Sequence, residues 1–249
     1  DHRAMTTQQT EQELREDLAA AYRLIAHFGM TDMVYTHLSL RLPGGGHRYL
    51  VNPYGLLFEE ITASSLVIVD ADGIPQQETS WAINPAGFVI HSAIHANRPD
   101  AACVIHTHTV PGMVVAAQDR GILPLNQINI EFYGTVAFHA YEGIAADDNL
   151  SERERLVRDL GSRNAIILQN HGLLSVGSTV AQAFYRIYYM EQACKIQIAA
   201  LATGVPLHVP SEEKILRAKS QFETDPDQGQ MIWKALRRKL DREQPDYKN

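Results

Sequence analysis

The chain has 249 residues, 45% of them apolar and 20% charged, a composition that can bury one large core. Its net charge of −7 and the lack of a basic cluster exclude a nucleic-acid-binding surface. No apolar stretch approaches the roughly 20 residues that cross a bilayer. The two cysteines, Cys103 and Cys194, lie in apolar stretches, which fits a reducing compartment better than a disulfide-stapled secreted domain. We therefore expect a cytoplasmic globular protein that binds neither nucleic acid nor membrane.

The N-terminal segment, residues 1–10, is polar and lacks the apolar core of a signal peptide. We predict that this segment is disordered. We interpret the four residues ahead of Met5 as residues added for expression of the protein. Apolar residues at three- and four-residue steps predict a first helix over residues 11–28, which Gly29 ends. Strands are then predicted at 34–42, 49–51 and 66–69, with glycine-rich turns between them.

A second helix is predicted from Asn84 to about residue 97, and a buried strand at 101–106. Residues 124–141 are predicted as mixed strand and loop. Ser151 is expected to begin another helix, with Glu154 completing a capping box. A strand at 165–168 and a long helix at 180–201 follow, and two helices are expected at 211–222 and 231–240.

Strands that alternate with helices indicate a layered α/β domain. We place this domain at residues 11–210 and a peripheral helical extension at 211–249. The long helix carries apolar residues on more than one side, among them Phe184, Tyr188 and Met190. Such a helix is deeply buried or lies at a subunit interface, which favours an oligomer.

The most informative motif is the pair His106 and His108 at the end of a buried strand. Side chains at positions i and i+2 of a strand point the same way, so these two rings can hold one ion between them. His171 directly follows another apolar strand and is the predicted third ligand, with Gly172 allowing a sharp turn there. A catalytic zinc site usually has three protein ligands and one open position. We predict a Zn²⁺ site on these three histidines, with Mn²⁺, Fe²⁺ and Co²⁺ as alternatives.

Other histidines have less specific surroundings. His91 and His95 are four residues apart on a predicted helix, a spacing that can bind metal, but a role in the core or at an interface is the better interpretation. His37 and His139 each end a strand-like run and could face the same site as the three predicted ligands.

Several motifs resemble the class II aldolase/adducin family, in order, from about residue 11 to residue 201. The sequences of these motifs are most similar to those of the adducin-like branch of the family. The matching motifs are NPYGLLF at 52–58, ITASSL at 61–66, INPAGF at 83–88, RPD at 98–100, HTH at 106–108 and NHGL at 170–173.

The resemblance implies a three-layer α/β/α fold with a central, mainly antiparallel sheet. It also implies a homotetramer with the metal near subunit boundaries, and it identifies His106, His108 and His171 as the metal ligands. In the family's sugar-phosphate aldolases and epimerases, a glutamate near the start of the second helix completes the site and moves the proton. That position is Gly87 here.

The family's phosphate-holding residues are also replaced. Its serines fall on Pro85 and Ala86, beside Asn84, and its asparagine falls near His37. Its threonine falls on Tyr54, before the matching Gly55, and the proton-donating tyrosine of the fuculose-type aldolases has no counterpart at 126–128. We therefore expect a substrate without phosphate. The residues predicted to bind it are His37, Tyr54, Gly55, Asn84 and Gly87.

Without the glutamate, a retro-aldol reaction lacks a general base, which typically contributes 10²–10⁴-fold. The predicted replacements are Glu131, His139 and Tyr141, or else His37. Glu131 is preferred, because a carboxylate in an otherwise uncharged stretch is costly unless it is used. A salt bridge or an exposed edge explains Glu131 equally well.

Three functions remain open. The first is a metal-dependent carbon–carbon lyase, an aldolase or decarboxylase, acting on a small hydroxy-carbonyl compound whose enediolate the metal stabilises. The second is a non-catalytic adducin-like binding or scaffold module that keeps the metal. Binding to actin is not expected, because the chain lacks the lysine-rich tail of eukaryotic adducins. The third is an iron-dependent oxygenase.

Overall fold

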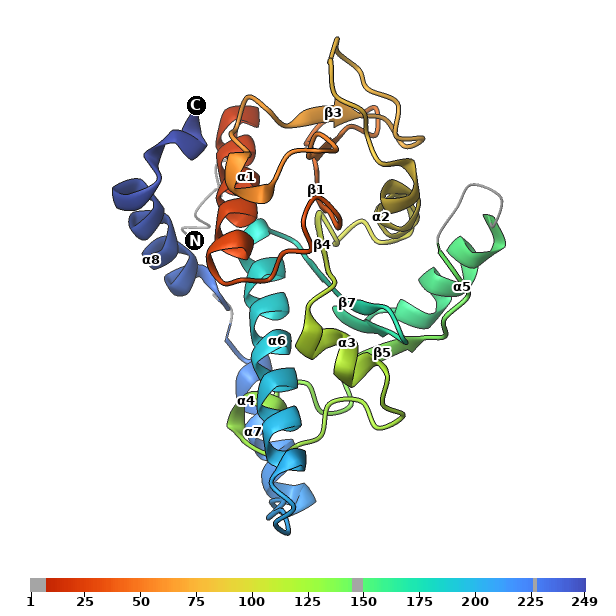
Figure 1. The fold of residues 1–249 in the computed structure, drawn as a ribbon, viewed down its shortest axis with the longest axis vertical. Coiled ribbons are helices and arrows are strands. Elements are labelled where there is room, and N and C mark those ends of the chain that lie inside the picture. Colours follow the sequence, from red (N-terminus) through yellow and green to blue (C-terminus); the bar gives the residue numbers. More distant parts are fainter. Residues whose placement is uncertain (1–7, 145–149, 226–227) are drawn as a thin grey trace, which may run out of the picture.

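The computed structural model describes residues 8–144, 150–225 and 228–249. These residues form one seven-stranded sheet with helices on both of its faces (Figure 1). Most of the N-terminal segment that we expect to be disordered lies outside the described residues. In chain order the elements are α1 (Glu11–His27), β1 (Leu38–Arg41), β2 (Tyr49–Val51), η1 (Phe58–Glu60), β3 (Val67–Val69), α2 (Pro85–Asn97), β4 (Cys103–Thr107), α3 (Val110–Ala116), α4 (Gln127–Ile130), β5 (Val136–His139), α5 (Leu150–Leu160), β6 (Ala165–Leu168), β7 (Gly172–Gly177), α6 (Val180–Ala202), α7 (Glu212–Glu223), α8 (Gln230–Glu243) and η2 (Pro245–Lys248).

The strand order in the sheet is β3-β2-β1-β4-β7-β6-β5. Neighbouring strands are antiparallel except for β5 and β6, which are parallel. This topology confirms the predicted α/β fold with a central, mainly antiparallel sheet. It also puts β4 in the middle, where both faces of the strand are covered.

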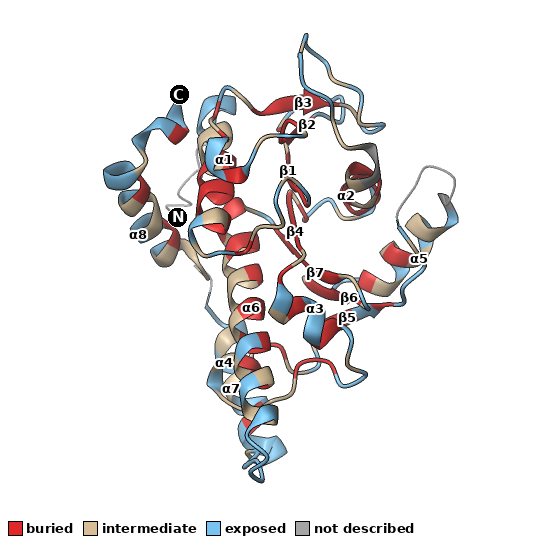
Figure 2. Cartoon of the chain, viewed as in Figure 1, coloured by how far each residue is buried: buried red, intermediate tan, exposed pale blue. Residues whose placement is uncertain are grey.

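Side chains of β4 alternate between the two helical layers. Cys103 and Ile105 pack in the large core cluster that contains buried residues of α1 and α6. Val104 packs in a second cluster with residues of α2 and α5. Figure 2 shows the buried residues gathered in the sheet and on the sides of α1 and α6 that face it. Because the alternation has period two, His106 lies on the same face of the sheet as Val104, toward α2.

The structure corrects three local predictions. The strand expected at 34–42 is confined to β1, and α5 begins at Leu150, so Ser151 lies inside the helix rather than at its cap. The sequence pattern does not predict strand β7, because it favours a turn at Gly172. Asn170, with φ of 58°, takes the left-handed conformation at this turn, and Gly172 is the first residue of β7.

The C-terminal elements α8 and η2 pack against α1. Trp233, Leu240 and Tyr247 are buried in the same core cluster as α1, and the Trp233 indole N–H donates to Asp17 Oδ1 at 3.1 Å. The proposed boundary at residue 210 stays a prediction. Among the described helices, none is long and apolar enough to cross a membrane.

Candidate metal centre

The three predicted metal ligands meet at one end of the sheet. The Nε2 atoms of His106 and His108 are 2.9 Å apart, and those of His108 and His171 are 2.8 Å apart. The third pair, His106 and His171, is separated by 3.3 Å. Three imidazole nitrogens from β4, from the loop after it and from the β6–β7 turn therefore converge on one point.

Hydrogen bonds at Nδ1 determine which nitrogen carries a proton in two of the three rings. His106 Nδ1 lies 2.8 Å from the carbonyl oxygen of Leu173, and His108 Nδ1 lies 3.0 Å from Asp32 Oδ2. Because a carbonyl or a carboxylate oxygen only accepts, each Nδ1 carries a proton, and in the neutral ring that binds metal the Nε2 atom then carries the lone pair. The two Nε2 lone pairs therefore face each other without a proton between them, an arrangement that suits a cation.

Burial keeps His106 and His171 in the neutral form that binds metal. Desolvation lowers the pKa of His106 well below its usual value, with smaller contributions from His171 and His108. Desolvation also lowers the pKa of His171 to about 4. Three nitrogens around a tetrahedral zinc ion lie about 3.4 Å apart, so the rings need to separate by only a few tenths of an ångström. The donor set, the protonation and the spacing thus fit a divalent ion such as Zn²⁺.

The pairing of β4 with β7 places His171 beside the other two ligands. Thr107 is the Cα partner of Leu173, so the turn that precedes β7 lies next to the end of β4. A Cβ atom on Gly172 would overlap the backbone carbonyl of Thr107. Glycine is therefore required at 172 by close backbone approach rather than by the turn predicted from the sequence.

A cavity of about 540 Å³ adjoins the three histidines. None of its described lining residues is Lys, Arg, Asp or Glu. Besides the three ligands, the lining residues are Tyr35, Thr36, His37, Asn84, Gly87, Ile90, His91, Met113, Tyr141, Gly143, Ile144 and Asn170.

His37 occupies the space beside Gly87. A Cβ atom built on Gly87 would overlap Cδ2 and Nε2 of the His37 ring. His37 Nδ1 lies 3.0 Å from Asn52 Oδ1, so this nitrogen donates and Nε2 carries the lone pair. Burial lowers the pKa of His37, which keeps the ring neutral. A neutral imidazole thus stands where a side chain at position 87 would project.

Two further histidines are held by Ser39. His95 Nδ1 donates to the carbonyl of Ala101 at 3.0 Å, which leaves His95 Nε2 to accept from Ser39 Oγ at 2.8 Å. Ser39 Oγ then accepts from His91 Nδ1 at 2.6 Å. Burial lowers the pKa of His95 to about 3, so the ring is neutral. Both histidines are buried, as their interpretation as core residues predicts, and His91 also lines the cavity.

The other predicted substrate-binding residues divide into two groups. Asn84 and Gly87 line the cavity at the start of α2. Tyr54 and Gly55 are not among its described lining residues. Tyr54 pairs with Ala82 in an isolated bridge, and its ring centroid lies 6.4 Å from that of Tyr35, which does line the cavity. The substrate-binding role of these residues stays a prediction.

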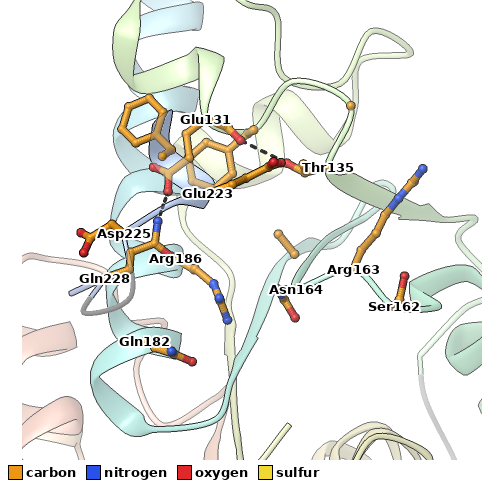
Figure 3. A pocket seen from close by; sticks show the side chains of 14 residues that line it. Glu131, Thr135, Ser162, Arg163, Asn164, Gln182, Arg186, Glu223, Asp225 and Gln228 are labelled. Carbon is orange, nitrogen blue, oxygen red and sulfur yellow. Dashed lines mark hydrogen bonds between the residues drawn. The ribbon is translucent and has the colours of Figure 1, made fainter. Parts of the chain in front are cut away.

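The three candidate bases lie in three different places. Tyr141 lines the histidine cavity. Glu131 borders a separate cavity of about 410 Å³, where its carboxylate accepts from Gln228 Nε2 (Figure 3). The same carboxylate also accepts from Tyr185 Oη at 3.1 Å. Burial raises the pKa of Glu131. These hydrogen bonds satisfy the carboxylate that we expected to be costly, and the structure does not bring Glu131 to the histidines of its own chain.

His139, the third candidate base, is bound by carboxylates. Its Nδ1 lies 2.8 Å from Asp159 Oδ2, and its Nε2 lies 3.2 Å from Glu152 Oε1 and 3.3 Å from Glu142 Oε2. Arg155 pairs with Glu142 at the edge of this group. His139 is not among the described residues that line the cavity of the three predicted ligands.

Two contributors to the site were not identified from the sequence. Asp32 orients His108, and Asn52 orients His37. Asn52 belongs to one of the motifs that carry the family resemblance, so a signal for it existed. Nothing near Asp32 in the sequence distinguishes it from a surface carboxylate.

The chain thus combines a layered α/β fold with three converging histidines that could hold a metal ion. The family model of the Class II Aldolase and Adducin N-terminal domain matches residues 16–198. The chain belongs to this class II aldolase/adducin family.

Two solved structures are similar over nearly the whole chain. An aldolase II superfamily protein from Pseudomonas syringae is 49% identical with a TM-score of 0.91, covering 98% of each chain. An L-fuculose 1-phosphate aldolase from Glaciozyma antarctica is 29% identical with a TM-score of 0.85, covering 98% of this chain and 96% of the other. Alpha-adducin from Rattus norvegicus is 42% identical over 197 residues, which are 78% of this chain but 26% of the adducin. The adducin match thus covers less of both chains than the two aldolase-type matches.

Proposed function

We propose that the protein is a metal-dependent carbon–carbon lyase, an aldolase or decarboxylase, that acts on a small hydroxy-carbonyl compound without a phosphate group. The observation that carries this proposal is the convergence of three Nε2 atoms within 2.8–3.3 Å of one another beside a cavity. Similarity to an L-fuculose 1-phosphate aldolase supports the reaction class.

His106, His108 and His171 would hold the ion, with Zn²⁺ preferred and Mn²⁺, Fe²⁺ or Co²⁺ as alternatives. A divalent ion held there supplies a Lewis acid for a carbonyl oxygen. Besides the three predicted ligands, the described lining residues include no carboxylate or thiol, and their two further imidazoles are held by Asn52 (His37) and by Ser39 (His91). An open position favours catalysis over a purely structural metal.

His37 is the group that we propose takes the proton in place of the glutamate expected at position 87. Its Nε2 lone pair lies beside Gly87, and Asn52 Oδ1 fixes the other ring nitrogen as the donor. A neutral imidazole in this position can accept a proton from a carbon or a hydroxyl group next to the carbonyl. Asn84, which lines the same cavity, is proposed to contact substrate oxygens.

The lack of cationic side chains in the described cavity lining supports a substrate without phosphate. Enzymes clamp phosphate with Arg, Lys or clusters of backbone N–H groups. No described lining residue is Arg or Lys. We therefore propose that the carbonyl and hydroxyl oxygens of the substrate bind beside the three histidines that would hold the metal.

Proton exchange tests this function with simple donors, so the full substrate need not be identified. The metal-loaded protein is incubated in D₂O with dihydroxyacetone, hydroxyacetone or hydroxypyruvate, and loss of the proton next to the carbonyl is followed by NMR. We expect exchange with at least one donor, its loss in His106→Ala, and a fall of 10²-fold or more in His37→Gln with the metal retained.

Failure of the metal-loaded protein to exchange any of these donors would contradict the lyase proposal. It would favour the alternative, a non-catalytic adducin-like module that retains the ion. Similarity to alpha-adducin over 197 residues is the observation behind that alternative and behind the proposed adducin-like branch.

We further propose that the protein is a homo-oligomer, with a tetramer suggested by the family. Large apolar side chains are exposed near the site: Met33 at 72%, Val110 at 69% and Val114 at 38%. Analytical ultracentrifugation tests this point, and a monomer at micromolar concentration would contradict it. A cytoplasmic location, and the absence of nucleic-acid, membrane and actin partners, stay predictions.

A further inference from the structure

We infer that the substrate carries an apolar group, aliphatic or aromatic, next to its hydroxy-carbonyl head, and that Met113, Tyr141 and Ile144 contact this group. The inference rests on the proposed function, because it assigns the rest of the cavity beside the proposed metal. The inference distinguishes the proposed substrate from polyhydroxylated sugars, whose binding sites need hydrogen-bonding groups along the whole length of the sugar.

The cavity lining combines polar and apolar side chains. Besides the histidines, Thr36, Asn84 and Asn170 contribute polar groups. Met113 comes from α3, and Tyr141 and Ile144 come from the segment after β5. One cavity thus offers both hydrogen-bonding groups and apolar surface to a ligand.

These three apolar side chains are exposed to solvent in the folded chain. Ile144 is 87% exposed, Tyr141 is 53% exposed and Met113 is 40% exposed. Exposed apolar side chains that border a cavity gain free energy when a ligand covers them. A volume of about 540 Å³ lies within the range of small-molecule sites and has room for more than a carbonyl head.

A small ligand explains the exposed apolar side chains better than a protein surface does, because Met113, Tyr141 and Ile144 line the same cavity as the three histidines. Ile90 of α2 also lines this cavity and is half-buried. A flat partner surface would not reach a residue within the cavity.

Two hydroxamates of different size test the inference. Acetohydroxamate and benzohydroxamate chelate a metal through the same atoms and differ in a methyl or a phenyl group. Their affinities for the metal-loaded protein are measured by calorimetry. We expect benzohydroxamate to bind about tenfold tighter, the gain from burying roughly 60 Å² of additional apolar surface.

Variants separate this gain from the intrinsic chelation strength of the two probes. In the double variant Met113→Ser/Ile144→Ser, the preference for benzohydroxamate should fall to about twofold while the affinity for acetohydroxamate stays unchanged. Met231→Ser is the matched control, because Met231 is a helical methionine that is 81% exposed and does not line the cavity. It should keep the full preference.

Equal affinities of the two hydroxamates in the wild type would overturn the inference. So would a preference that survives in the double variant. If the double variant instead lowers the sedimentation coefficient and keeps the preference, Met113 and Ile144 contact a second copy of the chain and the inference is wrong. Failure of the proposed function gives a different result: no donor would exchange its proton in D₂O, whereas the hydroxamate preference needs only the bound metal and no turnover.

Discussion

The contact between His37 and Gly87 can be tested by adding a single methyl group. In Gly87→Ala, the new Cβ atom would overlap two atoms of the His37 ring. The ring is buried and its Nδ1 is bound to Asn52. The variant must therefore displace His37 from its hydrogen bond or shift the first turn of α2.

The opposing free energies can be compared. Alanine is favoured over glycine within a helix by up to about 1 kcal/mol. Overpacking a buried site typically costs about 1–3 kcal/mol, and leaving a buried polar group without its partner costs about 1–3 kcal/mol. The two costs together are about 2–6 kcal/mol and exceed the helix term, so we expect Gly87→Ala to lower the free energy of unfolding by at least about 1 kcal/mol.

Urea unfolding of the metal-free protein measures this change, with His37→Ala as the background that removes the ring. In that background Gly87→Ala should be neutral or stabilising by up to about 1 kcal/mol. The two substitutions should therefore be coupled by at least about 1 kcal/mol. A single variant as stable as the wild type would refute the reasoning, because His37 would then leave its position freely.

Three further substitutions test other contacts. Asp32→Asn removes the carboxylate that accepts from His108, so chelator competition should give a metal affinity about 10–100-fold lower, and an unchanged affinity would contradict its orienting role. Burial lowers the pKa of His95 to about 3 in the fold, so the unfolded chain binds the additional proton as pH falls below the usual value near 6.5. Stability is complete above that value and is lost toward acid. The metal-free wild type should thus lose about 2 kcal/mol more than His95→Gln between about pH 7.5 and about pH 5, by urea unfolding. Gly172→Ala should cost about 3 kcal/mol, measured in the same way, because its Cβ atom would overlap the Thr107 carbonyl, and a free energy of unfolding equal to that of the wild type would exclude this clash.

Much of the fold follows from periodicity. The predicted helix at 180–201 corresponds to α6, and the predicted strands at 49–51 and 165–168 correspond to β2 and β6. The strand β7 escapes prediction because glycines begin and end it, and glycine is commonest in turns. Its strand conformation depends on pairing with β4 and β6, which no local pattern reveals.

The site was predictable where ligands share a local pattern. The i, i+2 spacing placed His106 and His108 on one face of a strand, and the structure confirms that they converge. The relation between His37 and Gly87 could not be predicted, because it joins residues 50 positions apart through tertiary packing. The same holds for Glu131, whose sequence context gives no indication of Tyr185 and Gln228.

Metal content measures the central claim most directly. After supplementation with Zn²⁺ and removal of free ions, mass spectrometry should find about one divalent ion per wild-type chain. His106→Ala, His108→Ala and His171→Ala should each lose it, while His37→Gln should keep it. A wild type without a stoichiometric ion would contradict the assignment of the three histidines as the metal centre. So would retention of the ion in the three histidine-to-alanine variants.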